Sequence, residues 1–288
     1  MKLFVTGANG YIGRNFINKA SIKGFKIFSL KRKKKNRKIK NVTWLVGPID
    51  KFWKELNKDV TLVHLAAAGA KREKGQNLKK FKNFNVTKSK RLLKNAVKSN
   101  CNKWIIISTN KEKRIEKARI TNSIIKKNKY DHDFNYALSK YLFTQECLKI
   151  AKENRIKCRI LRLFHIYGRD ENKSRLWPLL INAAKKNINF KMSSGDQLTD
   201  FNHIDDVVDG ILDATNFDKK NKKRYPQLWD MASGRSMTVK KFANAIWTKF
   251  KPKSKILFDK LAVYDQTNYK VQKNFHWKIK FTKPERAK

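Results

Sequence analysis

The segment YALSK at residues 136–140 contains the two residues with the clearest chemistry in this sequence, Tyr136 and Lys140. Residues four positions apart lie on one face of a helix, so the phenol and the ammonium come close together there. The ammonium favours the phenolate and lowers the tyrosine pKa from its ordinary value of about 10. The spacing therefore predicts a side chain that gives and accepts a proton near neutral pH.

A glycine-rich segment near the N-terminus predicts a partner for this acid. Residues 2–6 predict a buried strand, and TGANGYIG follows at residues 6–13. Glycines allow a tight turn and a close approach of the backbone to a pyrophosphate, and the N-terminus of the next helix attracts negative charge. We therefore expect a dinucleotide cofactor at this turn. The predicted contact residues are Gly7, Asn9, Gly10, Tyr11, Ile12 and Gly13.

Apolar strands alternate with helices over the first part of the chain. Strands are expected near 2–6, 26–30, 42–46, 60–65, 103–108 and 158–163, and helices near 11–23, 51–57, 77–99 and 135–153. Further on, the pattern predicts a helix near 175–187, a strand at 189–192 and a return to the sheet with a helix at 201–215. This alternation is typical of an α/β fold, a Rossmann-type doubly wound parallel sheet that binds ligands beyond the carboxyl ends of its strands.

The composition is strongly basic, with a formal net charge of +46 from 69 Lys and Arg against 23 Asp and Glu. Such a charge predicts nonspecific attraction to nucleic acid and anionic membranes at low salt. The lysines are spread over every segment together with many Asn, Ile and Phe residues, a pattern typical of AT-rich coding. We therefore favour that origin over a selected nucleic-acid function.

Three cysteines without CxxC spacing, Cys101, Cys147 and Cys158, indicate reduced structural thiols and predict neither a disulfide framework nor a metal site. No apolar run reaches the roughly 18–20 residues that cross a bilayer, and the N-terminus enters a strand at once. The expected location is the cytoplasm, with no membrane partner.

The order of seven motifs resembles that of the extended short-chain dehydrogenase/reductases, in the group of NAD(P)-dependent nucleotide-sugar epimerases, dehydratases and reductases. The motifs are TGANGYIG (6–13), HLAA (64–67), NVT (85–87), IST (107–109), YALSK (136–140), RLFHIYG (162–168) and DFNHIDD (200–206). The resemblance implies a dinucleotide-binding Rossmann domain of residues 1–165 and 201–224. It also implies a smaller, mainly C-terminal substrate-binding lobe of residues 166–200 and 225–288, and a homodimer.

The same resemblance assigns roles to residues of this chain. It implies that Thr109, Tyr136 and Lys140 are catalytic and that Tyr136 and Lys140 also contact the cofactor. Further expected cofactor contacts are Leu65, Ala66 and Ala67, and the expected substrate contacts are Asn85, Thr109, His165 and Arg235. Ser108 competes with Thr109, because alternation along a strand lets only one of them face the site, and we favour Thr109.

The end of the second strand indicates which dinucleotide binds. Folds that prefer NAD place a carboxylate there to bind the ribose 2′-OH, whereas residues 27–32 read IFSLKR. Lys31 and Arg32 suit a 2′-phosphate, so NADP(H) is favoured and NAD(H) is the alternative.

The residues after Thr109 indicate the reaction. Asn110 and Lys111 stand where the 4,6-dehydratases of this group carry an acidic pair, which argues against dehydration and leaves 4-keto reduction or 4-epimerisation. The segments around 162–168, 195–208 and 229–242 most resemble the NADPH-dependent CDP-abequose synthase branch. We therefore expect reduction of a 4-keto-6-deoxy sugar nucleotide for polysaccharide or O-antigen precursors, with a nucleotide-sugar 4-epimerase as the runner-up.

Two departures from the group keep a third class open. His165 stands where an Asn commonly contacts the sugar nucleotide, and Thr199 stands where an Arg clamps the diphosphate. A non-catalytic relative that binds NADP(H) or nucleic acid is therefore a further alternative.

Overall fold

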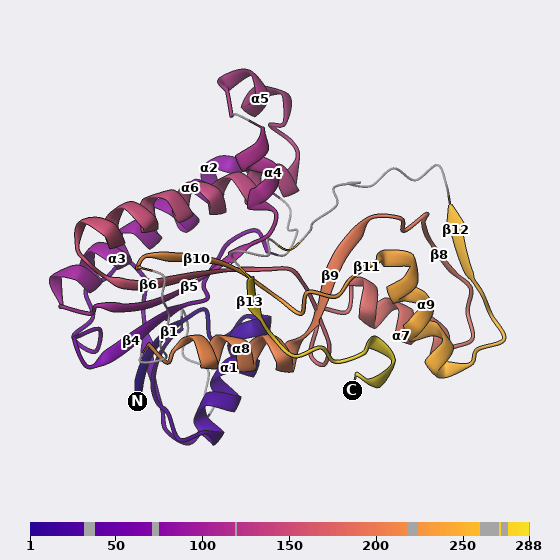
Figure 1. The fold of residues 1–288 in the computed structure, drawn as a ribbon, viewed down its shortest axis with the longest axis horizontal. Helices are drawn as coiled ribbons and strands as arrows, with labels where there is room; N and C mark the ends of the chain where they lie inside the picture. Colours follow the sequence, from indigo (N-terminus) through magenta and orange to yellow (C-terminus); the bar gives the residue numbers. More distant parts are fainter. Residues whose placement is uncertain are drawn as a thin grey trace. The chain divides into compact units, whose positions relative to one another are not determined.

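The computed structural model describes residues 1–31, 38–70, 75–118, 120–217, 224–259, 271 and 276–287 (Figure 1). The chain divides into two compact units. The first comprises Met1–Arg162 and Ile211–Trp229, and the second comprises Leu163–Gly210 and Asp230–Lys288. Residues 201–210 belong to the second of these units.

The main sheet has eight strands in the order β13-β10-β6-β5-β4-β1-β2-β3. The strands are β1 (Lys2–Thr6), β2 (Lys26–Lys31), β3 (Val42–Val46), β4 (Val60–His64), β5 (Lys103–Thr109), β6 (Lys157–Leu163), β10 (Gln227–Ala232) and β13 (His276–Lys278). β1 pairs in parallel with β2 and with β4, so that Leu3 lies opposite Ile27 on one side and Thr61 on the other. The strand order reverses between β1 and β4, which confirms the predicted doubly wound Rossmann-type sheet.

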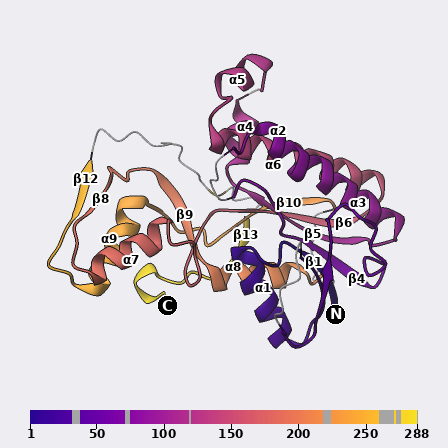
Figure 2. The ribbon, with the colours of Figure 1, turned by 180° about the vertical axis from the view of Figure 1, so that it is seen from behind.

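The helices of the first unit lie on both faces of this sheet. They are α1 (Tyr11–Ile22), α2 (Leu78–Phe81), the π-helical segment η1 (Lys82–Lys88), α3 (Ser89–Lys98), α4 (Glu112–Lys117), α5 (Asn122–Lys127) and α6 (His132–Glu153). Figures 1 and 2 show α3 and α6 on one face and α1 on the other. The predicted helix over 77–99 is confirmed, with a π-helical stretch in its middle.

The predicted helix over 51–57 is wrong, because these residues form turns. Two apolar side chains, Trp53 and Leu56, are buried there, and the Trp53 indole donates to the Pro48 carbonyl at 3.2 Å. The indole hydrogen bond and the burial of two anchors fix the turn without a helix.

The core of the first unit explains why its strands and helices pack as they do. Every residue of β4 is buried, as expected for a strand covered on both faces. On the α3 and α6 side, the core brings together strand and helix residues. Members of this cluster are Phe4, Leu62, Trp104, Ile106, Leu92, Phe143 and Ile150.

The second unit has two small sheets and a different kind of core. β9 (Leu198–His203) pairs antiparallel with β11 (Ser236–Thr238) and parallel with β7 (His165–Tyr167). β8 (Phe190–Ser193) pairs in parallel with β12 (Ile256–Asp259), and the helices include α7 (Leu176–Lys185) and α9 (Val239–Phe250). The predicted helix near 175–187 and strand at 189–192 are thus confirmed.

The expected return of 201–215 to the main sheet is wrong in its strand part. β9 belongs to the three-stranded sheet, and it is followed by α8 (Ile204–Ala214), which is the expected helix. Strand pairing of this kind depends on distant residues, here β7 and β11, so local pattern does not determine it.

Candidate active site

Helix α6 begins one residue after an N-cap and extends past the predicted proton donor. The Asp131 carboxylate accepts hydrogen bonds from the backbone N–H groups of Asp133 and Phe134 at 2.9 and 3.0 Å, which satisfies first-turn donors. Tyr136 and Lys140 follow one and two turns into the helix. The cap therefore fixes where the YALSK segment starts on the helix.

Lys140 lies against the end of strand β5. Its Nζ donates to the Ile107 carbonyl at 2.8 Å, and the residue is 2% exposed. Burial lowers the pKa of Lys140 to about 8, and the nearby carboxylate of Glu112 opposes that shift. The ammonium is therefore the main form at neutral pH, although the side chain is buried.

Tyr136 is half-buried beside the loop that follows β4. Its ring packs edge-on against Phe81, with ring centres 6.5 Å apart. A Cβ on Gly69 would lie 2.7 Å from the Phe81 ring and 2.9 Å from the Tyr136 ring, and Gly69 has a φ of 91°. Only glycine allows this loop to pass so close to the phenol ring.

The two hydroxyls at the end of β5 point to different partners. Ser108 Oγ donates to the Glu112 carboxylate and accepts from Thr144 Oγ1 at 3.3 Å, so it faces α4 and α6. Thr109 ends the strand and is 9% exposed, and its Oγ1 accepts from the Lys111 N–H at 3.4 Å. This difference favours Thr109 over Ser108 as the hydroxyl available to a substrate.

The glycine turn after β1 is as tight as the sequence predicts. A Cβ on Gly13 would lie 2.1 Å from the Gly7 carbonyl oxygen, and one on Gly7 would lie 2.5 Å from the Ala66 nitrogen. Gly10 is the N-cap of α1, without a side-chain cap, and the first turn of α1 has no acidic residue. Uncapped N–H groups at a helix N-terminus beside bare backbone fit the diphosphate of a dinucleotide.

The remaining predicted contacts of this turn surround it. Asn9 lies in the turn, and Tyr11 and Ile12 open α1 and are half-buried. In the loop after β4, the Leu65 N–H donates to the Thr6 carbonyl at 3.2 Å, and the Ala66 N–H donates to Thr6 Oγ1 at 3.4 Å. Ala67 is half-buried in the same loop.

His64 joins this turn to a helix, a role that the sequence did not suggest. Its Nδ1 lies 2.7 Å from Thr6 Oγ1, and its Nε2 lies 3.1 Å from Ser89 Oγ. Burial, and secondly the charge of Lys140, lower the pKa of His64 to about 3. A neutral imidazole thus links β1, β4 and α3 below the predicted cofactor site.

The buried amide of Asn85 forms hydrogen bonds with other groups of the protein. It lies in the π-helical segment and is 1% exposed. Its Oδ1 accepts from the Ala68 N–H at 2.7 Å, and its Nδ2 donates to the Ala68 carbonyl and to Ser139 Oγ, both at 2.9 Å. These bonds hold the loop after β4 against α6, so Asn85 has a positioning role in this structure.

The predicted 2′-phosphate site is described in part. Lys31 ends β2, and its Nζ lies 4.8 Å from the centre of the Trp44 ring. Arg32 lies outside the described residues. The described strand β2 ends in Leu30 and Lys31 without a carboxylate.

The other predicted substrate contacts belong to the second unit. His165 is half-buried on β7, with its ring centre 4.8 Å from that of Phe201. Arg235 is exposed, and its guanidinium lies 5.1 Å from the centre of the Phe281 ring. Thr199 is buried in β9 opposite Met237.

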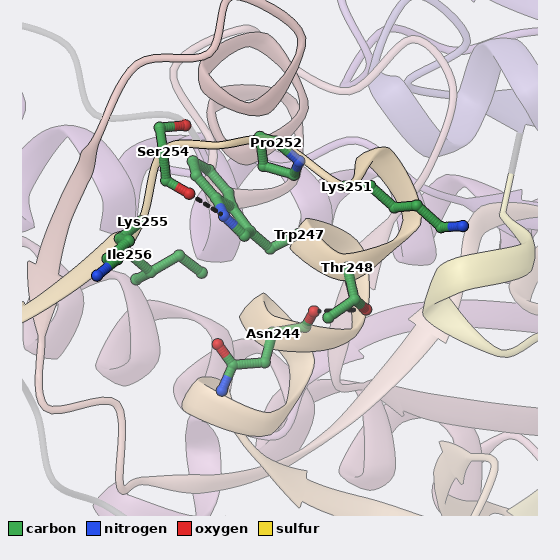
Figure 3. Close-up of a pocket in the computed structure, with 8 residues that line it drawn as sticks. All are labelled: Asn244, Trp247, Thr248, Lys251, Pro252, Ser254, Lys255 and Ile256. Carbon is green, nitrogen blue, oxygen red and sulfur yellow. Dashed lines mark hydrogen bonds between the residues drawn. The ribbon is translucent and has the colours of Figure 1, made fainter.

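Figure 3 shows an open pocket of the second unit, where α9 ends and β12 begins. It is lined by Asn244, Trp247, Thr248, Lys251, Pro252, Ser254, Lys255 and Ile256. The Trp247 indole donates to the Ser254 carbonyl at 3.2 Å. None of the predicted site residues lines this pocket, so we do not assign the chemistry to it.

No helix of the described residues is long and apolar enough to cross a membrane.

Comparison with known proteins also indicates a nucleotide-sugar enzyme. Residues 3–225 match the NAD dependent epimerase/dehydratase family. CDP-abequose synthase of Salmonella typhimurium is 25% identical over 277 residues, which cover 92% of this chain and 86% of that protein.

Two solved structures share the fold at low identity. UDP-N-acetylglucosamine 4-epimerase of Methanobrevibacter ruminantium has a TM-score of 0.76 at 16% identity, covering 95% of this chain and 90% of that one. dTDP-glucose 4,6-dehydratase of Bacillus anthracis, in complex with NAD, has a TM-score of 0.72 at 19% identity, covering 99% and 94%. With the glycine turn and the Tyr136–Lys140 helix on the same sheet, the family match shows that this chain belongs to the NAD dependent epimerase/dehydratase family of nucleotide-sugar enzymes, in the extended short-chain dehydrogenase/reductase group.

Proposed function

We propose that this protein reduces the 4-keto group of a 4-keto-6-deoxy sugar nucleotide with NADP(H), for polysaccharide precursors. The main supporting observation is the hydrogen bond from Lys140 Nζ to the Ile107 carbonyl at 2.8 Å. It joins the α6 face that carries Tyr136 to the strand end that carries Thr109. The similarity to CDP-abequose synthase over 92% of the chain supports a reductase in particular.

Each of the three residues has a distinct task in this proposal. Tyr136 donates its phenolic proton to the sugar oxygen as the carbonyl is reduced. Lys140 stays an ammonium, which stabilises the resulting phenolate and contacts the ribose of the cofactor. Thr109 donates a hydrogen bond to the same sugar oxygen. NADP(H), held at the turn around Gly7 and Gly13, supplies the hydride when bound.

Dehydration is not favoured by the residues after Thr109. The Lys111 ammonium pairs with Asp133 at 3.1 Å, and Asn110 is an amide. The next carboxyl group, Glu112, is fully buried and faces Ser108 and Thr144. The two positions after Thr109 therefore offer a substrate neither the acid nor the base of an elimination.

A preference for NADP(H) is supported by the end of β2. The Lys31 ammonium lies over the Trp44 ring there. A cation at this place binds the 2′-phosphate of NADP(H) better than it binds the ribose 2′-OH of NAD(H). We expect tighter binding of NADPH than of NADH, and a loss of that preference in Lys31→Ala and Arg32→Ala. Lys26→Ala removes one charge from the start of β2 and is the matched control. Equal affinities for the two cofactors in the wild type would contradict this preference.

We further propose a cytoplasmic homodimer. The three cysteines of the chain are free and buried, in keeping with a reducing compartment. Sedimentation at physiological salt tests the dimer, since a monomer at micromolar concentration would contradict it.

A 4-epimerase is the second candidate, because its reaction would use the same Tyr136, Lys140 and Thr109. The distinguishing property is the fate of the cofactor. A reductase consumes one NADPH for each product and releases NADP, whereas an epimerase keeps its cofactor through each cycle.

Absorbance of NADPH during reaction with a 4-keto-6-deoxy sugar nucleotide tests the proposal. We expect stoichiometric loss of NADPH and a 4-hydroxy product. Copurification of a tightly bound cofactor, with interconversion of C4 epimers and no net loss of NADPH, would instead support the epimerase. If neither reaction occurs while NADPH binds tightly, the chain is a cofactor-binding relative with another task.

A further inference from the structure

We propose that Glu112 is a positioning residue for Lys140, a buried carboxylate held by Ser108 and Thr144 that keeps the Lys140 ammonium charged. The inference deepens the proposed function, and it rests on that function for the role of Lys140 in proton transfer. It concerns a residue that neither the motifs nor the pattern of the sequence singled out.

Two hydrogen bonds connect α6 with the end of β5. Tyr136, Lys140 and Thr144 follow one another at intervals of four, so they share the face of α6 that meets the end of β5. Lys140 Nζ donates to the Ile107 carbonyl at 2.8 Å, and Thr144 Oγ1 donates to Ser108 Oγ at 3.3 Å. Thr109, the next residue of β5, bonds instead to Asn110 and Lys111.

Glu112 closes this arrangement from the first turn of α4. One carboxylate oxygen, Oε1, accepts hydrogen bonds from Thr144 Oγ1 at 2.8 Å and from Ser108 Oγ. Thr144 is one helical turn beyond Lys140, so the carboxyl is held by the residue next to Lys140 on the same face of α6. The two hydroxyls fix the carboxyl on the inner side of the predicted site.

Burial indicates that this carboxyl is more than a bridge between elements. Glu112 and Thr144 are 0% exposed, and Lys140 is 2% exposed. The second carboxylate oxygen, Oε2, is buried and has no hydrogen-bond partner among the described residues. A buried, half-satisfied carboxyl costs stability, and a neutral amide would serve as well to join the two hydroxyls. The property that distinguishes Glu112 from an amide is its negative charge above its pKa of about 7.

The opposite charges of Glu112 and Lys140 each favour the ionised form of the other group. Burial raises the pKa of Glu112 to about 7, while the two hydroxyls and the charges of Lys140 and Arg162 oppose that shift. Burial lowers the pKa of Lys140 to about 8, and the charge of Glu112 opposes that shift first. Without Glu112, the desolvated ammonium loses its proton at lower pH.

Other ionisable groups face this pair from the neighbouring elements. They are His64 on β4, Tyr136 and Cys147 on α6, and Arg162 on β6. His64 is neutral near pH 7, since its pKa is about 3, and Arg162 pairs with Glu116 at 2.8 Å. Among these described neighbours, Glu112 has the largest charge effect on Lys140, ahead of Cys147.

The test measures the titration of Lys140 in the cofactor-free protein. NMR of protein labelled with 13C at the lysine ε-carbon reports each ammonium, and the Lys140→Arg variant identifies the signal. Ordinary lysines titrate at about 10.4, so a midpoint near 8 is distinct. In Glu112→Gln, which keeps the shape and removes the charge, we expect the midpoint to fall by about one pH unit.

Two variants complete the comparison. Glu146→Gln removes a carboxylate from the surface of α6, where it pairs with Lys90, and should leave the midpoint unchanged. Thr144→Val keeps Glu112 but removes one hydrogen bond to its ionised form, so it should lower the midpoint by less than Glu112→Gln does. It also keeps the test valid if Glu112→Gln fails to fold. A Lys140 midpoint that stays at its wild-type value in every folded variant overturns the inference.

The pH dependence of turnover gives the second readout. The alkaline limb of kcat against pH should move to lower pH in Glu112→Gln by the same amount as the NMR midpoint, and Glu112→Asp should restore part of the shift. A shifted NMR midpoint with no turnover in the wild type would contradict the proposed function and leave the link between Glu112 and Lys140 intact. A shifted midpoint with an unmoved alkaline limb would overturn the role of that link in proton transfer.

Discussion

The two units bury polar residues in different ways. In the first unit, buried polar side chains gather at the carboxyl ends of β1, β4 and β5 and link these strands to α3, α4 and α6. In the second unit, buried carboxylates hold the backbone of connecting segments: Asp200 Oδ1 accepts from Ser233 N and Ser233 Oγ at 3.0 and 2.9 Å, and Asp206 Oδ2 accepts from Thr282 N at 2.8 Å. The hydrophobic core of that unit combines aliphatic residues such as Leu180 and Ile246 with aromatic ones. Phe201 stacks on Phe242 with ring centres 3.8 Å apart, and Tyr167 packs edge-on against Phe242 at 5.0 Å.

We infer from this difference that the first unit supports the reaction and that the second unit selects the substrate. The polar network of the first unit supports the glycine turn and the helix that carries Tyr136 and Lys140. The second unit carries His165 and Thr199, which depart from the group, and Arg235, which the Ser233 turn holds through a 3.2 Å bond to the Arg235 N–H. We therefore expect changes in the first unit to affect turnover and cofactor binding, and changes in the second unit to affect substrate affinity.

The largest expected effect is that of Tyr136→Phe. Removing the transferable proton should lower kcat by roughly 10²–10⁴-fold and leave NADPH affinity almost unchanged. Tyr141→Phe, a change of the same kind further along α6, is the control. Steady-state rates with a 4-keto sugar nucleotide decide the matter, and a near wild-type rate in Tyr136→Phe would show that the catalytic assignment is wrong.

The second expected effect concerns the glycine turn. Gly13→Ala brings a Cβ to 2.1 Å from the Gly7 carbonyl oxygen, so the turn must open. We expect NADPH affinity to fall by at least about tenfold, the equivalent of about 1.4 kcal/mol. Gly24→Asn places a side chain in open space at a left-handed position that Asn tolerates, and it serves as control. Fluorescence titration with NADPH measures both, and unchanged affinity in Gly13→Ala would refute the predicted cofactor site.

The third effect is a pH dependence of stability from His64. Its folded pKa of about 3 lies below the unfolded value of about 6.5, so its contribution is complete above pH 6.5 and is lost as the pH falls toward 3. Relative to that of His64→Gln, the free energy of unfolding of the wild type should fall by about 1.4 kcal/mol for each pH unit between pH 6 and pH 4. Urea unfolding at several pH values measures this difference, and parallel curves for the two proteins would exclude a neutral buried His64.

The smallest expected effect belongs to the second unit. Arg235→Ala should raise KM for the sugar nucleotide by about three- to tenfold with kcat nearly unchanged, because an exposed guanidinium contributes modestly to anion binding. Lys241→Ala, an exposed charge on α9, is the matched control. A lower kcat at constant KM would break the comparison, since it would connect Arg235 to the chemical step.

The sequence predicted the sheet because its strands are apolar, short and bounded by turn residues, as in β4, where every residue is buried. It predicted Tyr136 and Lys140 because helical spacing alone puts them on one face. It missed Glu112 and the network of His64, because their partners Thr144, Thr6 and Ser89 are far away in the chain. The only available signal for Glu112 was an acidic residue three positions after the end of β5.

Other errors have the same origin. The turns at 51–57 contain apolar residues at helical spacing, and what fixes them is the Trp53–Pro48 hydrogen bond. The hydrogen bonds of the Asn85 amide to Ala68 and Ser139 are likewise not revealed by sequence spacing, and its contact with substrate stays a prediction. Local pattern thus predicts elements and motifs, while the partners of buried polar groups need the fold.

Isotope transfer tests the central claim most directly. NADPH carrying deuterium at the transferred position of its nicotinamide is mixed with a 4-keto-6-deoxy sugar nucleotide, and the product is analysed by NMR. The account predicts one deuterium at C4 for each NADPH consumed, and loss of that transfer in Tyr136→Phe. A product without deuterium at C4, or equal transfer by wild type and Tyr136→Phe, would contradict it.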